Sequence, residues 1–159
     1  MVALTLFNLP YLMLYFIGLV IAVQRRKRQP WFLSFWAIGC YGLLIVLGLL
    51  KMWQVGTIIN AHELGVWKSE PRWFDILGYV RTALLYVCNI VLMIVALLWR
   101  KGSDDGRPLT FVLIAAALFI AGTLMGRLGI SGPVAMLNFL IDLGATTTLI
   151  IAVYGWRRE

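Results

Sequence analysis

The sequence predicts an all-α integral membrane protein, a bundle of five transmembrane helices in a single domain that covers residues 1–159. Hydrophobic residues make up 62% of the chain, whereas soluble domains are typically about 45–50% apolar. A chain this short has too much surface for its volume to hide such an excess in a soluble core. In addition, apolar runs of about 20 residues, the length that crosses a hydrocarbon core of about 30 Å, recur between short polar segments.

Five segments have the length of a membrane-spanning helix. Pro30, Pro108 and Pro133 precede three of them, and proline suits a helix start because the first turn leaves its N–H without a partner in any case. The first segment has no basic residues before it and no small-residue cleavage site after it, so we expect a retained span rather than a signal peptide. The expected spans are residues 4–23, 31–50, 74–99, 109–128 and 134–155.

The last two spans are separated by a predicted turn. Residues 109–155 are largely apolar, but one helix of that length would reach about 70 Å, more than twice the hydrocarbon thickness. The sequence GISGP at 129–133 clusters turn-forming residues. We therefore expect two antiparallel spans joined by a very short connection.

Basic residues predict the orientation of the bundle, with the N-terminus outside and the C-terminus inside. Five spans place the segments 25–28, 100–107 and 156–159 on one side, with nine basic residues against three acidic ones. Cytoplasmic loops carry such an excess of Lys and Arg. The net charge of +7 is therefore attributed to topology and to anionic lipid headgroups rather than to a polyanionic ligand. We expect no nucleic-acid partner, and a location in the bacterial inner (cytoplasmic) membrane.

The sizeable segment between the second and third spans, residues 51–73, is expected as an outer loop, and no soluble domain is expected. Within it, residues 55–67 have apolar positions near helical spacing, so this part either extends the second span or lies on the membrane surface. His62, Glu63 and Asp75 are expected above the outer face, where they would cover a site in the bundle.

Polar side chains inside the expected spans mark a candidate site. Arg81 and Asp142 lie about 10 Å and about 12 Å from the outer ends of their spans by helical rise, and Asn138 lies one turn from Asp142 on the same face. An unpaired charge in lipid costs at least about 2.5–3.5 kcal/mol, so we expect these groups to face the bundle interior. Arg127 either joins Asp142 or reaches the surface. Two interpretations stay open: a buried ion pair that fixes helix packing, and a polar site for a solute, ion or lipid.

Small residues and cysteines give weaker signals. Gly122 and Gly126 form a G-x-x-x-G pair, which lets helix backbones approach closely either within the monomer or between subunits. Cys40 and Cys88 both fall in apolar runs without a C-x-x-C motif. The sequence therefore gives no support for a disulfide or a zinc site.

The motifs of known catalytic and metal chemistry do not occur in the sequence. Its single histidine excludes a haem held by two histidines of one chain and an H-E-x-x-H zinc site, and it has no G-x-S-x-G or Gly-rich phosphate loop. We expect no catalytic residue, cofactor or metal. The foremost prediction is a non-catalytic subunit of a homo- or hetero-oligomeric membrane complex, with lipids and other subunits or copies of itself as partners. The alternatives are a channel or transporter that uses Arg81, Asn138 and Asp142, and a membrane enzyme that uses His62, Glu63 and Asp75.

Overall fold

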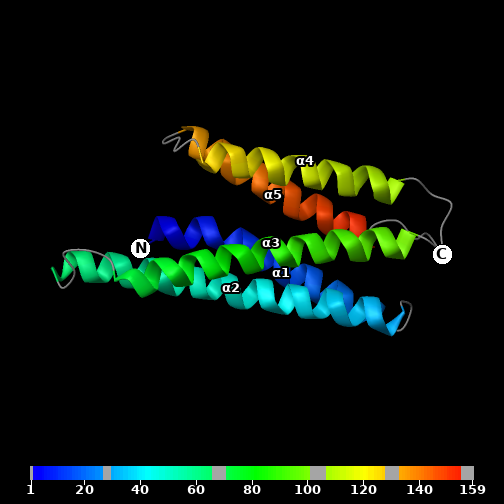
Figure 1. Cartoon of the computed structure of the whole chain (residues 1–159), viewed down its shortest axis with the longest axis horizontal. Helices are drawn as coiled ribbons and strands as arrows, with labels where there is room; N and C mark the ends of the chain where they lie inside the picture. The colour runs from blue at the N-terminus through cyan, green and yellow to red at the C-terminus, as the bar shows by residue number, and fades with distance from the viewer. Residues whose placement is uncertain (1, 27–29, 66–70, 101–106, 128–132, 155–159) are drawn as a thin grey trace.

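The chain folds into antiparallel helices. The computed structural model describes residues 2–26, 30–65, 71–100, 107–127 and 133–154, and the side chains of 8–26, 30–65, 71–98, 109–125 and 136–153. The described residues form five helices and no strand: α1 (Val2–Arg25), α2 (Trp31–Glu63), α3 (Arg72–Arg100), α4 (Arg107–Arg127) and α5 (Pro133–Tyr154). Consecutive helices run in opposite directions, so α1 begins and α5 ends at opposite ends of the bundle (Figure 1). The prediction of an all-α fold is confirmed.

Four of the described helices are long and apolar enough to cross a membrane, namely α1, α2, α3 and α5. The described apolar segment of α4, Leu109–Met125, has 17 residues and would span about 26 Å by helical rise. Large hydrophobic side chains are exposed on the outer faces of all five helices, where a soluble protein would carry polar groups. These features indicate insertion in a membrane. Examples of the exposed side chains are Met13, Phe16, Phe35, Val46, Ile76, Val87, Leu113, Ile120, Met136 and Leu140.

Helix α2 extends beyond the expected span of 31–50, because residues 51–63, assigned to the outer loop, continue the helix. Of the two alternatives for residues 55–67, the extension of the second span is confirmed as far as Glu63. The 33 residues of α2 span about 50 Å by helical rise. The extension is helical because it packs on the start of α3: the rings of Trp53 and Phe74 are 5.9 Å apart, and Gln54 is buried. Gly65 follows the end of α2 with a φ of 63°, which suits glycine. The α2–α3 hairpin therefore extends beyond the other helices at this end of the bundle (Figure 1).

The tightly packed core occupies one half of the bundle, toward the ends where α1 leads to α2 and α3 leads to α4. Ala22, Ala37, Ala96 and Ala115, from four different helices, are all 0% exposed. Small side chains at these positions let the helix backbones approach closely. Larger core side chains fill the same half, including Leu33, Leu92, Val95, Val112, Leu149 and Val153. We call this half the closed half.

The two cysteines meet in the bundle although 48 positions separate them in the sequence (88 − 40). Cys40 of α2 and Cys88 of α3 are buried free thiols whose side chains lie close enough to interact. No spacing motif in the sequence signalled this contact. It results from the antiparallel register of α2 and α3.

Candidate functional site

A cavity of about 530 Å³ lies in the half of the bundle opposite the closed half, and every helix contributes to its wall. Ligand pockets in proteins commonly have volumes of about 300–1,000 Å³. The wall combines apolar side chains with an unusual number of polar ones for a membrane-like bundle. The polar lining is Asn8, Tyr11, Tyr15, Lys51, Tyr79, Arg81, Thr82, Tyr86, Thr123, Asn138, Asp142 and Thr146.

The structure brings three of the predicted site residues to this cavity: Arg81, Asn138 and Asp142. Arg81 lies nine residues after the first residue of α3, and Asp142 nine residues after the first residue of α5. Each is thus about 14 Å from its helix start by helical rise. Helix α3 begins farther out than α5 (Figure 1), and both charges nevertheless line the same cavity. Asn138 lies one turn before Asp142 on α5 and lines the same wall.

Arg81 is oriented by a glutamine that the sequence did not single out. Nη1 of Arg81 donates a hydrogen bond of 2.6 Å to Oε1 of Gln54. Gln54 is buried in α2, and its Nε2 donates to the carbonyl oxygen of Phe74 at 3.5 Å. A guanidinium has five N–H donors, so the bond to Gln54 fixes its direction and leaves donors for a ligand in the cavity.

Lys51 is a second basic residue of the cavity wall, and the sequence placed it in the outer loop instead. It comes from α2, and its charge interacts with that of Asp142. The cavity therefore has basic groups on α2 and α3 and acceptor groups on α5. We call Lys51 and Arg81 the basic pair, and Asn138 and Asp142 the acceptor pair.

The acceptor pair lies directly against a glycine of α4. A Cβ atom at Gly122 would collide with Oδ1 of Asp142 and would lie 3.4 Å from Oδ1 of Asn138. Gly122 therefore serves a contact within the monomer, between α4 and α5. Oδ1 of Asn138 is buried and receives no hydrogen bond within the described chain. Gly126 and Arg127 end α4, but their surroundings lie outside the described side chains.

The three residues expected to cover the site are not together. His62 and Glu63 are exposed in the last turn of α2 and line no part of the cavity. Asp75 lines a smaller hollow of about 300 Å³ between α2 and α3, which shares Tyr79, Arg81 and Thr82 with the main cavity. Arg81 thus lies where the two spaces meet.

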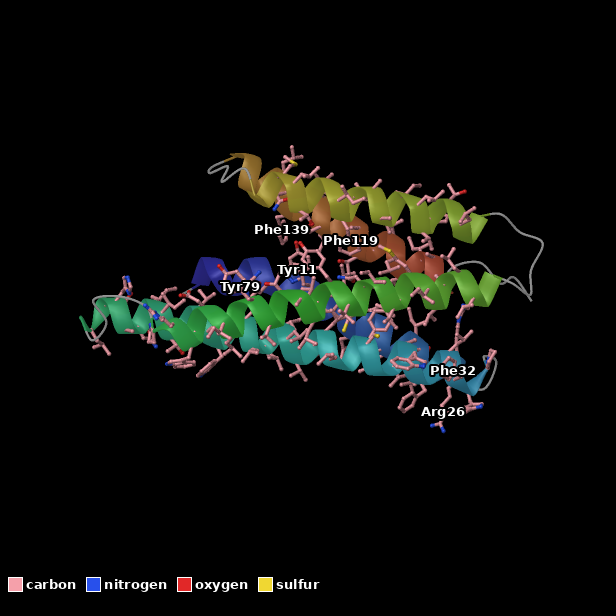
Figure 2. All side chains as sticks on the ribbon, in the orientation of Figure 1. Tyr11, Arg26, Phe32, Tyr79, Phe119 and Phe139 are labelled. Atoms are coloured by element: carbon pink, nitrogen blue, oxygen red, sulfur yellow. The ribbon has the colours of Figure 1, made fainter. Side chains whose placement is uncertain are left out.

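The cavity opens sideways along α3. Tyr79, Thr82 and Tyr86 follow one face of this helix, line the cavity and are exposed, Tyr79 by 77%. Opposite them, Thr123 of α4 shares a 2.9 Å hydrogen bond with the Tyr86 hydroxyl. Figure 2 shows Tyr11 and Phe119 in the region between α3 and the α4–α5 pair. The opening therefore lies at the side of the bundle, where lipid would surround it.

Deeper in the cavity, hydrogen bonds tie the wall to the helix backbone. The Tyr11 hydroxyl of α1 donates to the carbonyl oxygen of Phe139 in α5 at 3.2 Å, and the two rings meet edge to face at 5.4 Å. Thr146 donates to the carbonyl oxygen of Asp142 at 3.0 Å. The Tyr11 contact joins α1 to α5, the helix that carries the acceptor pair, and the Thr146 bond lies within α5.

The polar groups of the wall come from several kinds of side chain. The wall offers cationic donors, a carboxylate, amides and hydroxyls. Among the described residues, no group of three or more His, Cys, Asp or Glu side chains could hold a metal ion. Comparison with protein families, with curated proteins and with solved structures gave no match to this chain.

Proposed function

We propose that the chain is a non-enzymatic integral membrane protein that binds a small polar or amphiphilic solute in the cavity, as a channel or transporter does. The observation that carries the proposal is a 530 Å³ cavity with charged and amide groups inside a bundle whose outer surface is apolar. Charged groups are costly within a membrane, and those that occur there commonly serve a pathway or a binding site.

The proposed topology has five spans, with the N-terminus outside and the C-terminus inside the bacterial inner membrane. The excess of basic residues at the end with the α1–α2 and α3–α4 connections supports this orientation. Helix α4 has 21 residues, and its first and last residues are arginines. The long side chain of an arginine can reach the headgroups from a short span. In this orientation the cavity lies near the outer face, and the closed half seals the cytoplasmic side.

Solute flux into proteoliposomes tests the proposal. The panel contains small anions, small cations and zwitterions, each tested separately. We expect at least one of them to cross faster than in protein-free liposomes. The substitution Gly122→Leu should reduce that flux at least tenfold, because the new side chain would collide with Asp142 and displace it in the cavity wall.

The matched control is Gly39→Leu, since Gly39 is exposed on α2 and a Cβ there would meet nothing within 4 Å. This variant should keep the flux of the unmodified protein. Flux that never exceeds the protein-free level, or that Gly122→Leu leaves unchanged in a folded protein, would contradict the proposal.

A second candidate function is that of a subunit in a membrane complex. It is supported by the first turns of α2, where Trp31, Phe35 and Trp36 are exposed beside the open position Gly39. Large aromatic side chains around a glycine form a surface into which another helix can pack. Native mass measurement after gentle extraction tests this function: a companion chain or a second copy is expected, and a lone monomer would contradict it. Gly39→Leu should disrupt the assembly without reducing flux.

A further inference from the structure

We infer that the solute is a zwitterion, with its acidic group bound by the basic pair and its ammonium group bound by the acceptor pair. This inference rests on the proposed function of the cavity. It goes further because it assigns a charge pattern to the ligand. The pattern follows from the separation of opposite charges onto different helices around one space.

The basic pair can bind a carboxylate or a phosphate. Arg81 is held by Gln54 through Nη1, so its remaining N–H donors have a fixed direction before a ligand arrives. A guanidinium forms paired hydrogen bonds with carboxylate and phosphate oxygens. Lys51 adds a second positive charge from α2 on the same wall. Among the described residues that line the cavity, two cations accompany one carboxylate, which leaves positive charge for an acidic ligand group.

The acceptor pair can bind an ammonium group. Asp142 supplies a negative charge, and Asn138 supplies a buried Oδ1 that receives no hydrogen bond within the described chain. A buried acceptor without a donor is unfavourable, and an ammonium group carries three N–H donors. The two residues lie one turn apart on α5, so a single ammonium can reach both. Gly122 of α4 lies directly against both residues, and its lack of a side chain lets Asp142 and Asn138 keep their positions in the cavity wall.

The rest of the cavity fits an amphiphile. Its apolar wall contains Leu44, Leu47, Leu85 and Phe119, and its opening lies along the exposed side of α3. A ligand can therefore enter from the lipid with an apolar part still in the membrane. The shared chemistry is an ammonium group joined to an acidic group, and it occurs both in aminophospholipid headgroups and in free zwitterions such as phosphoethanolamine.

Thermal unfolding of the purified protein in a neutral detergent tests the inference. The probes are phosphatidylethanolamine, phosphatidylglycerol (acidic, without an amine), soluble phosphoethanolamine and inorganic phosphate. A ligand present at about 100 times its dissociation constant should raise Tm by about 5–10 °C for a chain of this size. We expect this shift with phosphatidylethanolamine or with phosphoethanolamine, and a much smaller one with phosphatidylglycerol and with phosphate. A shift with the lipid alone identifies a headgroup ligand, and a shift with phosphoethanolamine identifies a free zwitterion.

Two variants assign the two ends of the ligand. Asp142→Asn should abolish the preference for phosphatidylethanolamine over phosphatidylglycerol, and Arg81→Gln should reduce the shift caused by either lipid. Arg81→Lys should restore part of the shift, which separates binding from a loss of fold. The controls are Glu63→Gln and Arg72→Gln, which change exposed residues outside the cavity and should leave every shift unchanged.

The failures of the two proposals are distinguishable. Equal shifts with phosphatidylglycerol and phosphatidylethanolamine would overturn the zwitterion while leaving a solute-binding cavity. The zwitterion would also be wrong, and the solute-binding cavity retained, if no zwitterionic probe shifts Tm but Gly122→Leu still reduces flux at least tenfold. If no probe shifts Tm and Gly122→Leu leaves flux unchanged, both the zwitterion and the proposed function are wrong.

Discussion

Single glycines determine how closely neighbouring helices of this bundle approach. A Cβ atom at Gly18 of α1 would lie 2.5 Å from Cε1 of Tyr41, whose ring on α2 is 1% exposed. The ring therefore packs directly on the α1 backbone. Gly122 likewise lets α4 and α5 approach closely, because the Asp142 side chain packs directly on the α4 backbone at this glycine.

Replacing Gly18 by valine should destabilise the protein. The new methyl groups would displace the Tyr41 ring from a filled core, and overpacking of this kind typically costs about 1–3 kcal/mol. Reversible unfolding in mixed detergent measures the change. Gly42→Val on α2 is the control, because a Cβ there would meet nothing within 4 Å. Equal losses of unfolding free energy in the two variants would show that the contact with Tyr41 does not cause the destabilisation.

Replacing Gln54 by leucine should loosen Arg81. The guanidinium would lose the acceptor at 2.6 Å, and a partly buried charged donor without that partner costs about 1–2 kcal/mol. We expect lower stability and a weaker shift by zwitterionic probes than in the unmodified protein. Gln24→Leu changes an exposed glutamine of α1 and should have little effect. Unchanged ligand binding in Gln54→Leu would mean that Arg81 needs no orientation by Gln54.

The sequence predicted the charged part of the site better than the groups around it. Arg81, Asn138 and Asp142 are conspicuous because each interrupts an apolar run. The tyrosines of the wall, such as Tyr11 and Tyr15, are not conspicuous in the sequence, since aromatic residues at helical spacing also form ordinary packing faces. Gln54 gave no signal because its role depends on the register of α2 against α3, which no local pattern encodes.

At the scale of elements, the helices were predictable and the end of α2 was not. The apolar runs and the proline at position 133 predicted where helices lie, and the structure places a helix in each expected segment. The second span was expected to end at about residue 50, and residues 55–67 were expected either to extend it or to lie on the membrane surface. Packing on α3 continues the helix to Glu63, and only Gly65 stops it. That continuation is also what brings Lys51 into the cavity wall.

The contact between α2 and α3 can be tested through Cys40 and Cys88. A membrane-permeant oxidant such as diamide should join the two thiols, which lose two protons and two electrons to the diamide. The intact mass of the chain should fall by about 2 Da per disulfide without any dimer forming, because the two thiols are already neighbours in the bundle. Cys88→Ser should prevent this change. Oxidation that yields only dimers would contradict the register of α2 and α3.

At the scale of the whole molecule, the bundle has two unlike halves. Alanines from four helices close one half, and a polar cavity fills the other. The described part of the cavity opens along α3, away from the closed half. Composition and hydropathy predicted a helical membrane protein, but they could not predict this asymmetry, because it depends on which small residues meet across helices.

The proposed topology makes a separate prediction at this scale. Reporter domains fused to the two ends of the chain should report opposite compartments, with the C-terminal reporter cytoplasmic, because the basic residues gather at that end of the bundle. Reporter activity in intact cells measures this directly. Two reporters on the same side would rule out an odd number of spans.

The most direct test of the account is the reactivity of cysteines at two adjacent positions of α4 in a membrane-embedded protein. Phe119 lines the cavity, whereas Ile120 is 63% exposed on the outer surface. In a chain with Cys40 and Cys88 replaced by alanine, a charged, membrane-impermeant thiol reagent should modify Phe119→Cys at least tenfold faster than Ile120→Cys. This result is expected if water enters the cavity from the outer compartment and lipid covers the outer surface of α4. Equal rates, or faster reaction at position 120, would contradict a polar cavity inside a lipid-embedded bundle.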